Sequence, residues 1–304
     1  MNTSPTYGIP WNPAVYYEHQ IDTNGDYVAD ITFRATFPIA ADGTQYVQVE
    51  QLAGTAATDR TASGTIITPP NCPVGEVVNC LHGIRLFAGQ RRGLSFIPFP
   101  VATTNALATG TFPDYNALRP ATNSFANTTV RSYILEVPAR LTGIRTLNYW
   151  ATTAYFDTGH NTWVQVQRAG GPNVTTFFEF TTGLAQININ ATAPADDLAG
   201  RPANPATDPA TGIWGQVRDN TAAVVQAGGT YRDFPHSFRT ALAYGAWAAD
   251  TLLPNVIPFT PGTFADWDPW KGIRNGKGVI EDIASNGIKM IVNQDFSTGP
   301  PASS

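Results

Sequence analysis

The chain has 304 residues, which is enough for one large domain or two ordinary ones with a substantial core. Charged residues make up only 13% of the chain, about half of the usual share in a soluble domain. The net charge of −5 leaves no basic stripe that could release counterions, which argues against a nucleic-acid partner. No apolar run approaches the length that crosses a bilayer, so we expect no transmembrane segment.

Most of the basic side chains are arginines. Lysine occurs only at positions 271, 277 and 289, and arginine provides the other basic groups. A surface of this kind depends on Thr, Asn, Gln and Ser for solubility, which favours an extracellular or periplasmic protein or one that buries surface in an assembly. The N-terminus MNTSPTYGIPWNP shows no basic region followed by an apolar stretch, so no signal peptide is visible. Either the chain is not exported by that route or a signal was removed.

The first part of the chain predicts strands, because short segments rich in Val, Ile, Thr, Tyr and Phe are bounded by Gly, Pro, Asn or Asp. Strands that follow one another without helices between them indicate an antiparallel sandwich or barrel. The sequence therefore predicts a mainly β domain over residues 1–190. The predicted strands cover residues 14–21, 29–37, 44–52, 64–69, 82–89, 131–139, 146–156, 162–170 and 174–182.

The composition changes after residue 190. An Ala-, Pro- and Asp-rich connector is followed by segments 213–228 and 234–254, in which apolar residues recur at helical spacing. Pro254 ends the second segment. A third helix is predicted over 278–293, broken near Asn286. Residues 191–304 are thus expected to be a mostly helical and irregular extension packed on the same domain.

The turn between the first two predicted strands is unusually acidic. Side-chain oxygens of Asp22, Asn24, Asp26 and Asp30 fall at positions 1, 3, 5 and 9 of the segment, and the carbonyl of Val28 falls at position 7. This is the oxygen spacing of the first part of an EF-hand loop, although the glycine at position 6 and the glutamate at position 12 are missing. We predict a structural calcium site; the alternative is an ordinary solvated turn.

The two cysteines, Cys72 and Cys80, lie eight residues apart around a Pro-Val-Gly turn. We predict a local disulfide, which would contribute about 2.5 kcal/mol in the chain-entropy model and would favour an oxidising compartment. The alternative is a pair of reduced thiols on a loop. A metal pair is less favoured, because only His82 lies nearby and four ligands would be needed.

The segment FADWDPWKGIRNG places two indoles beside acidic and basic side chains on one predicted loop. Its residues Trp267, Asp268, Trp270 and Arg274 form a candidate ligand-binding site, since loops that carry large aromatic residues often bind ligands. The alternative is that the two tryptophans clamp the C-terminal segment onto the sheet.

The four histidines do not lie in a recognisable catalytic frame. His19 follows Glu18 on the first strand, so the two side chains point to opposite faces, one of them inward and close to the acidic turn. His160 is predicted in a hairpin turn near Asp157, and His236 at a helix start. Each has an ordinary structural or surface interpretation.

Residues 16–37, YYEHQIDTNGDYVADITFRATF, resemble the opening of a bacterial family known as domain of unknown function 4331, whose members carry a Tyr-Glu-x-x-Ile-Asp-x-Asn-Gly-Asp-Gly-x-x-Asp hairpin. Segments 86–96, 133–143, 149–174 and 264–293 are similar to later family motifs in the same order. The family's frequent Ser-His-Arg-Glu-Ala-Pro start is absent. Its acidic pairs are replaced by Arg92-Gly93 and, in a shifted context, by Glu281-Asp282. The resemblance implies a secreted or envelope location and a β-rich fold, but no reaction.

Two functions follow as hypotheses. The first is an exported, calcium-binding β-rich protein that acts by binding or assembly, as a homo-oligomer or with a partner, through uncovered strand edges. The alternative is an enzyme acting on a small apolar metabolite in an aromatic-lined pocket. A deep aromatic pocket with a buried His or Asp would favour the second hypothesis, and a filled core without a cavity would contradict it.

Overall fold

The computed structural model describes residues 10–92, 129–143, 145–172, 174, 189–232, 236–278 and 289–290. Its main sheet has the strand order β10-β8-β1-β2-β3-β4, and β9 pairs with the second half of β8. A second sheet has the order β5-β6-β7, and all pairings are antiparallel. The strands are β1 (Val15–Asp22), β2 (Ile31–Thr36), β3 (Gln48–Ala53), β4 (Thr65–Ile66), β5 (Val77–Asn79), β6 (Arg85–Arg92), β7 (Thr129–Glu136), β8 (Leu147–Asp157), β9 (Thr162–Ala169), β10 (Ile257–Phe259), β11 (Asp266–Asp268) and β12 (Ile273–Asn275).

The two sheets bury a shared apolar layer. Tyr17, His19 and Ile21 alternate along β1 and pair with residues of β2 that point the same way. Side chains of this face join Leu86 of β6 and Tyr133 of β7 in one buried cluster. The period of two along each strand thus places one face of the main sheet against the second sheet, as in a sandwich.

Within the described residues, the helical part has two α-helices that pack against each other, together with short 3₁₀ turns. The side chain of Thr240 caps the second helix by accepting a hydrogen bond from the backbone N–H of Ala243 at 3.1 Å. The first helix ends at Gly229, which has a φ of 72° and so takes the left-handed conformation that glycine tolerates. The helices are α3 (Gly212–Gly228) and α4 (Ala241–Leu252); the 3₁₀ turns are η1 (Gly54–Ala57), η2 (Leu81–Gly83), η4 (Ala139–Leu141), η5 (Ile189–Ala191), η6 (Pro194–Asp196), η7 (Thr230–Arg232) and η8 (Pro269–Lys271).

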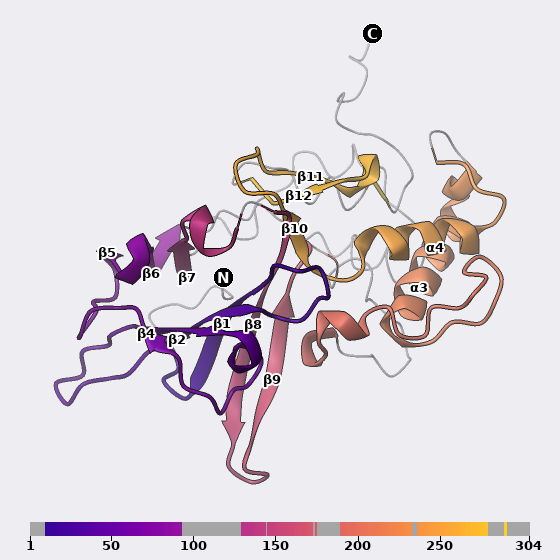
Figure 1. Ribbon diagram of the computed structural model, residues 1–304. Helices are drawn as coiled ribbons and strands as arrows, with labels where there is room; N and C mark the ends of the chain where they lie inside the picture. The colour runs from indigo at the N-terminus through magenta and orange to yellow at the C-terminus, as the bar shows by residue number, and fades with distance from the viewer. Residues whose placement is uncertain are drawn as a thin grey trace.

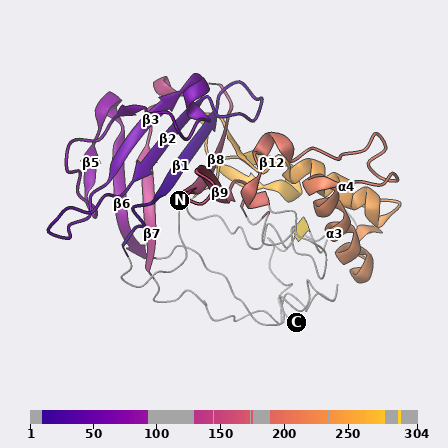
Figure 2. The same ribbon diagram turned by 90° about the horizontal axis from the view of Figure 1, so that it is seen from below.

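The C-terminal third is tied to the sheet rather than merely appended to it. Its strand β10 pairs with the start of β8 (Figure 1). Arg168 of β9 forms a fully buried ion pair with Asp197 of the connector at 2.6 Å, and Asp197 also accepts a hydrogen bond from the backbone N–H of Asn255. Figure 2 shows the second sheet at one end of the molecule and helices α3 and α4 at the other, with the main sheet between them.

The structure confirms the predicted fold class, an antiparallel β sandwich with a helical C-terminal part. The second helix is shorter than predicted: it begins at Ala241 instead of residue 234, because Thr240 has extended backbone geometry and serves as the cap. The predicted strand 174–182 and most of the predicted helix 278–293 lie outside the described residues. None of the helices in the described ranges is both long and apolar enough to cross a membrane.

Candidate functional site

The acidic turn connects β1 and β2, and Asp22 organises it. One carboxylate oxygen of Asp22 accepts hydrogen bonds from the backbone N–H groups of Asn24 and Gly25, at 2.9 and 2.6 Å. The other accepts from the backbone N–H of Tyr27 at 2.9 Å and from the side-chain amide of Asn148 at 2.8 Å. Burial by itself raises the pKa of Asp22, but these hydrogen bonds together outweigh it and hold the pKa below its usual value.

The other polar side chains of the turn are also bonded within it. Asp30 accepts hydrogen bonds at 2.7 Å from the backbone N–H and from the hydroxyl of Thr23. The side-chain oxygen of Asn24 accepts from the backbone N–H of Asp26, and a carboxylate oxygen of Asp26 accepts from the backbone N–H of Val28, both at 2.9 Å. The loop is therefore a series of side-chain-to-backbone turns.

The structure does not assign a calcium ion to these residues. Across the described part of the chain, no group of three or more His, Cys, Asp or Glu side chains is arranged to hold a metal ion. Without compensation, the carboxylates of Asp22, Asp26 and Asp30 would repel one another within this short turn. The structure shows another source of compensation, namely N–H donors. Calcium at Asp22, Asn24, Asp26, Val28 and Asp30 thus stays a prediction from the spacing.

The predicted disulfide is wrong: Cys72 and Cys80 are both free thiols. Cys72 is buried, and its carbonyl accepts a hydrogen bond from the backbone N–H of Val47. The backbone N–H of Cys80 bonds to the carbonyl of Ile84. Each backbone is thus held by its own partner, and a short separation in sequence does not bring the sulfur atoms to bonding distance. Burial and, secondarily, the neighbouring Cys80 raise the pKa of Cys72 to about 11, so it stays a thiol.

The four residues predicted to bind a ligand lie on β11, η8 and β12. Trp267 and Trp270 are almost completely buried, and Asp268 is buried beside the ammonium groups of two lysines. Burial lowers the pKa of Arg274 to about 10. Its guanidinium donates to the carbonyl oxygens of Thr251, Pro254 and Val256, where α4 ends. This placement favours the clamp alternative, and none of the four lines the cavity described next.

A cavity of about 710 Å³ lies where the main sheet, β7 and the loop between β10 and β11 meet. Its wall is mostly aliphatic and aromatic, and the residues come from segments far apart in the sequence. A volume of this size is typical of a pocket for one small molecule. The apolar wall includes Ile21, Phe33, Leu135, Leu147, Ile257 and Phe259.

Two hydrogen-bonded polar side chains interrupt this apolar wall. The Nδ1 atom of His19 lies 2.8 Å from the hydroxyl oxygen of Tyr149, and the imidazole packs 4.4 Å from the ring of Tyr133, measured between centroids. His19 is only 7% exposed, and its Nε2 atom is buried without a hydrogen bond of good geometry among the described residues, although the backbone of Tyr133 lies close enough to act on the pKa of the ring. A buried polar atom left in this way is costly, so it calls for an explanation.

The protonation states follow from burial. Desolvation lowers the pKa of His19 well below its ordinary value, so the imidazole is neutral near pH 7. Burial also raises the pKa of Tyr149, so its hydroxyl keeps its proton. If Tyr149 donates to Nδ1, the Nε2 atom of His19 carries a hydrogen and is a donor; if Nδ1 donates to Tyr149, Nε2 is an acceptor. The pair is therefore neutral in either tautomer.

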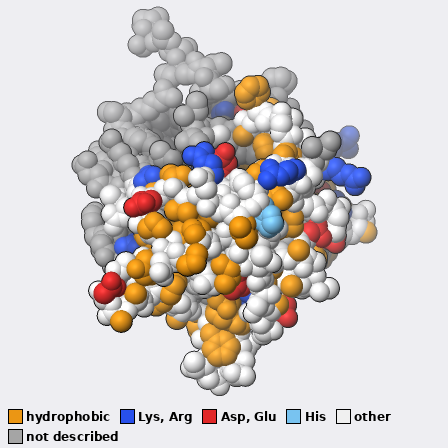
Figure 3. All heavy atoms as spheres, turned by 60° about the vertical axis from the view of Figure 1, so that its left-hand side comes forward, with side chains coloured by type: hydrophobic (Ala, Val, Ile, Leu, Met, Phe, Trp, Pro, Cys, Tyr) orange, Lys and Arg blue, Asp and Glu red, His pale blue; other side chains and the backbone are white. Residues whose placement is uncertain are grey.

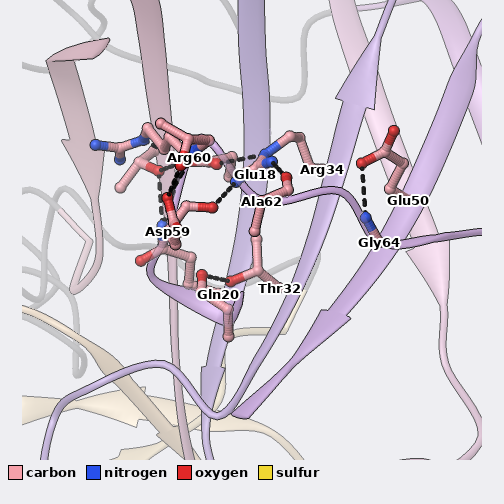
Figure 4. Close-up of polar contacts among 12 residues, drawn as sticks. Glu18, Gln20, Thr32, Arg34, Glu50, Asp59, Arg60, Ala62 and Gly64 are labelled. Carbon is pink, nitrogen blue, oxygen red and sulfur yellow. Dashed lines mark hydrogen bonds and ion pairs between the residues drawn. The ribbon is translucent and has the colours of Figure 1, made fainter. Parts of the chain in front are cut away.

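The opposite face of the main sheet is polar, and its charges are paired (Figure 4). The carboxylate of Glu18 is 3.0 Å from the Nε atom of Arg34 and 3.0 Å from that of Arg60, and it accepts a hydrogen bond from the hydroxyl of Thr152 at 2.9 Å. Arg34 also donates to the carbonyl oxygens of residues 59 and 62. Glu18 is 1% exposed. This cluster holds the segment after η1 onto the sheet.

The remaining histidines lie outside the cavity wall. His160 lies in the turn between β8 and β9 and contacts the carboxylate of Asp157 at 2.7 Å, in the predicted hairpin position. The Nε2 atom of His236 is 2.9 Å from the carbonyl oxygen of Trp270. Tyr149 was missed at the sequence level. Its strand was predicted, but nothing local marks a partner that lies 130 residues away in the chain.

Comparisons with family models, with curated proteins and with solved structures found no match to this chain. The resemblance to the family of domain of unknown function 4331 stays a prediction from its motifs. The proposed function therefore rests on the geometry of the cavity and its polar side chains.

Proposed function

We propose that this protein binds a small, mostly apolar molecule in the cavity between the main sheet and β7. The observation that carries the proposal is the combination of an apolar volume of about 710 Å³ with His19, a buried imidazole whose Nε2 atom has no hydrogen bond of good geometry among the described residues. Apolar pockets with a few convergent polar groups are the usual form of small-molecule sites.

The polar groups indicate what kind of molecule fits. Among the described lining residues the one charged side chain is that of Lys277, which is exposed, so nothing deeper in the wall would compensate a ligand charge. The neutral pair of His19 and Tyr149 offers hydrogen bonding without charge. We therefore infer a neutral ligand with an apolar body and one hydroxyl or carbonyl group.

A neutral apolar fluorophore, N-phenyl-1-naphthylamine, provides the test. We expect its fluorescence to increase on binding, and we expect Ala265→Phe to weaken binding by about tenfold or more, because the added ring occupies cavity volume beside the wall. The control is Ala41→Phe, the same substitution in an exposed turn away from the cavity. Saturable binding that is equal in wild type and Ala265→Phe would contradict the proposal, as would the absence of binding.

One observation favours the enzyme hypothesis. In the tautomer in which Nδ1 donates to Tyr149, the Nε2 atom of the neutral, buried His19 can accept a proton, as acid–base chemistry on an apolar substrate requires. Once a ligand is known, His19→Gln separates the two functions. Conversion that is lost while binding is retained would support an enzyme, and the absence of conversion by the wild type would leave a binding protein.

The other expectations also stand as proposals. Calcium binding rests on the oxygen spacing of the acidic turn, and an extracellular or periplasmic location rests on composition and on the motif resemblance. Assembly into a homo-oligomer is supported by exposed apolar side chains on edge strands, with Ile66 of β4 49% exposed and Val77 of β5 57% exposed.

A further inference from the structure

The cavity has an identifiable open end. Four of its lining residues are exposed, namely Ile134 on β7, Ala139 on η4, Gly262 in the loop between β10 and β11, and Lys277 just after β12. The opening is therefore framed by β7 and η4 on one side and by the loop of residues 260–265 on the other. Any ligand of the proposed kind would enter here.

The loop that frames the opening presents Phe264 to solvent. This side chain is 96% exposed, the highest value among the exposed large hydrophobic side chains of the described residues. The backbone beneath it is held in place: the side-chain amide of Asn275 donates to the carbonyl of Phe264 at 2.8 Å, and the hydroxyl of Thr263 donates to the carbonyl of Thr260 at 2.6 Å. The ring is thus presented on a fixed loop whose neighbours Pro261, Gly262 and Ala265 line the cavity.

Basic side chains surround the same opening. Leu147 pairs with Phe259, and the hydroxyls of Thr146 and Thr260 lie 2.8 Å apart, which places Arg145 beside the loop of residues 260–265. Arg140, on η4, donates a hydrogen bond to the carbonyl of residue 82, an uncharged partner. Within the described residues, neither arginine forms an ion pair.

Both arginines and Lys277 are exposed, and so are the acids Asp266 on β11 and Glu136 on β7, the second of which is paired with Arg85. Among the described side chains around the opening, basic groups therefore outnumber acidic ones, although the whole chain carries −5. On the face shown in Figure 3, most of the visible Lys and Arg side chains lie in the upper half.

We propose that the open end of the cavity docks on an anionic lipid surface, with Phe264 inserted between the lipids and Arg140 and Arg145 near the headgroups. A bilayer supplies both an apolar phase for the ring and negative charge for the cations. A second copy of the chain would bring the same positive charge to the contact. The lipid would also be the source of the apolar ligand, and in that part the inference rests on the proposed function.

The test is sedimentation of the full chain with vesicles at millimolar lipid, either pure phosphatidylcholine or phosphatidylcholine with 30 mol% phosphatidylglycerol. We expect binding to the anionic vesicles that weakens at high salt. Phe264→Ser should reduce the partition coefficient about tenfold. Arg145→Gln should reduce it about fivefold. The matched control is Ile66→Ser, which removes an exposed apolar side chain of β4, at the other edge of the main sheet from β10.

Absence of binding to anionic vesicles would overturn the docking proposal, and so would equal loss in Phe264→Ser and Ile66→Ser. Self-association that depends on Phe264 in analytical ultracentrifugation, without vesicle binding, would assign the loop to a contact between copies and would also overturn it. Phe264 does not line the cavity, so Phe264→Ser should bind N-phenyl-1-naphthylamine as the wild type does. Failure of docking is thereby distinguishable from failure of the cavity proposal.

Discussion

The two faces of strand β1 have opposite chemistry although their residues alternate along a single chain. On one face Glu18 is buried with two arginines and a threonine, and each charge has a partner. On the other face His19 is buried beside an apolar cavity, and one of its nitrogens has no hydrogen bond of good geometry among the described residues.

Buried polar groups play two different roles on these two faces. A network with every member bonded holds segments together and leaves no room for another molecule. A buried polar atom without a partner costs free energy unless something else binds it. The polar face of β1 is therefore interpreted as structural. The cavity face is interpreted as the place where a bound ligand would supply the missing hydrogen bond.

The largest effect is expected from Glu18→Gln on the polar face. The substitution keeps the shape but leaves the buried guanidinium group of Arg34 and the partly exposed one of Arg60 without a carboxylate, so we expect the free energy of unfolding to fall by about 3–5 kcal/mol. The measurement is urea unfolding. The control is Glu136→Gln, which breaks the exposed pair with Arg85 and should cost less than about 1 kcal/mol. Similar losses in both variants would mean that the buried Glu18 network contributes no more stability than an exposed ion pair.

The acidic turn extends the polar face, because Asp22 follows Glu18 and Gln20 on the same side of β1. If calcium binds as proposed, a concentration about a hundredfold above its dissociation constant would add about 2.7 kcal/mol of stability and raise the melting temperature by about 5 °C or more. Asp26→Ala should abolish this increase with little effect in chelator, since Asp26 is exposed. Asp22→Ala should destabilise the protein in chelator as well, because four hydrogen bonds end on its carboxylate.

Equal melting temperatures of the wild type in chelator and in millimolar calcium would show that calcium does not stabilise the acidic turn. The turn would then be held by its own hydrogen bonds. A loss of stability in Asp22→Ala would remain expected in that case, so the two explanations are separable.

The smallest effect is a pH dependence that belongs to the cavity face. The pKa of His19 is lowered in the folded state, while an unfolded histidine titrates near 6.5. The unfolded state therefore takes up a proton first as the pH falls. The contribution of His19 to the free energy of unfolding is complete above about pH 6.5. It declines below that pH, by up to about 1.4 kcal/mol per pH unit. The lowered pKa of Asp22 acts the same way only at more acidic pH, below about 3.9.

Unfolding free energies measured between pH 7 and 5 test this assignment. His19→Gln should show a flatter pH dependence than the wild type. Tyr149→Phe should lower stability by about 1 kcal/mol, because it deletes one hydrogen bond, while keeping the slope. A slope that is unchanged in His19→Gln would show that the histidine is not enclosed as the structure has it.

Local patterns in the sequence determined strands β1 to β4 and β6 to β9, the first helix, and the placement of Glu18 and His19 on opposite faces. Each of these depends on alternation, helical spacing or turn chemistry within a few residues. The sequence could not show that Cys72 and Cys80 stay apart, or that Trp267 and Trp270 are buried, since both depend on how distant segments pack.

The cavity was decided by tertiary structure alone. His19 meets Tyr149 across 130 positions of the chain, and the wall is completed by β7 and by the loop after β10. No local pattern encodes an empty volume, because a cavity is what remains when sheets, turns and loops from distant parts of the chain have packed as closely as their shapes allow.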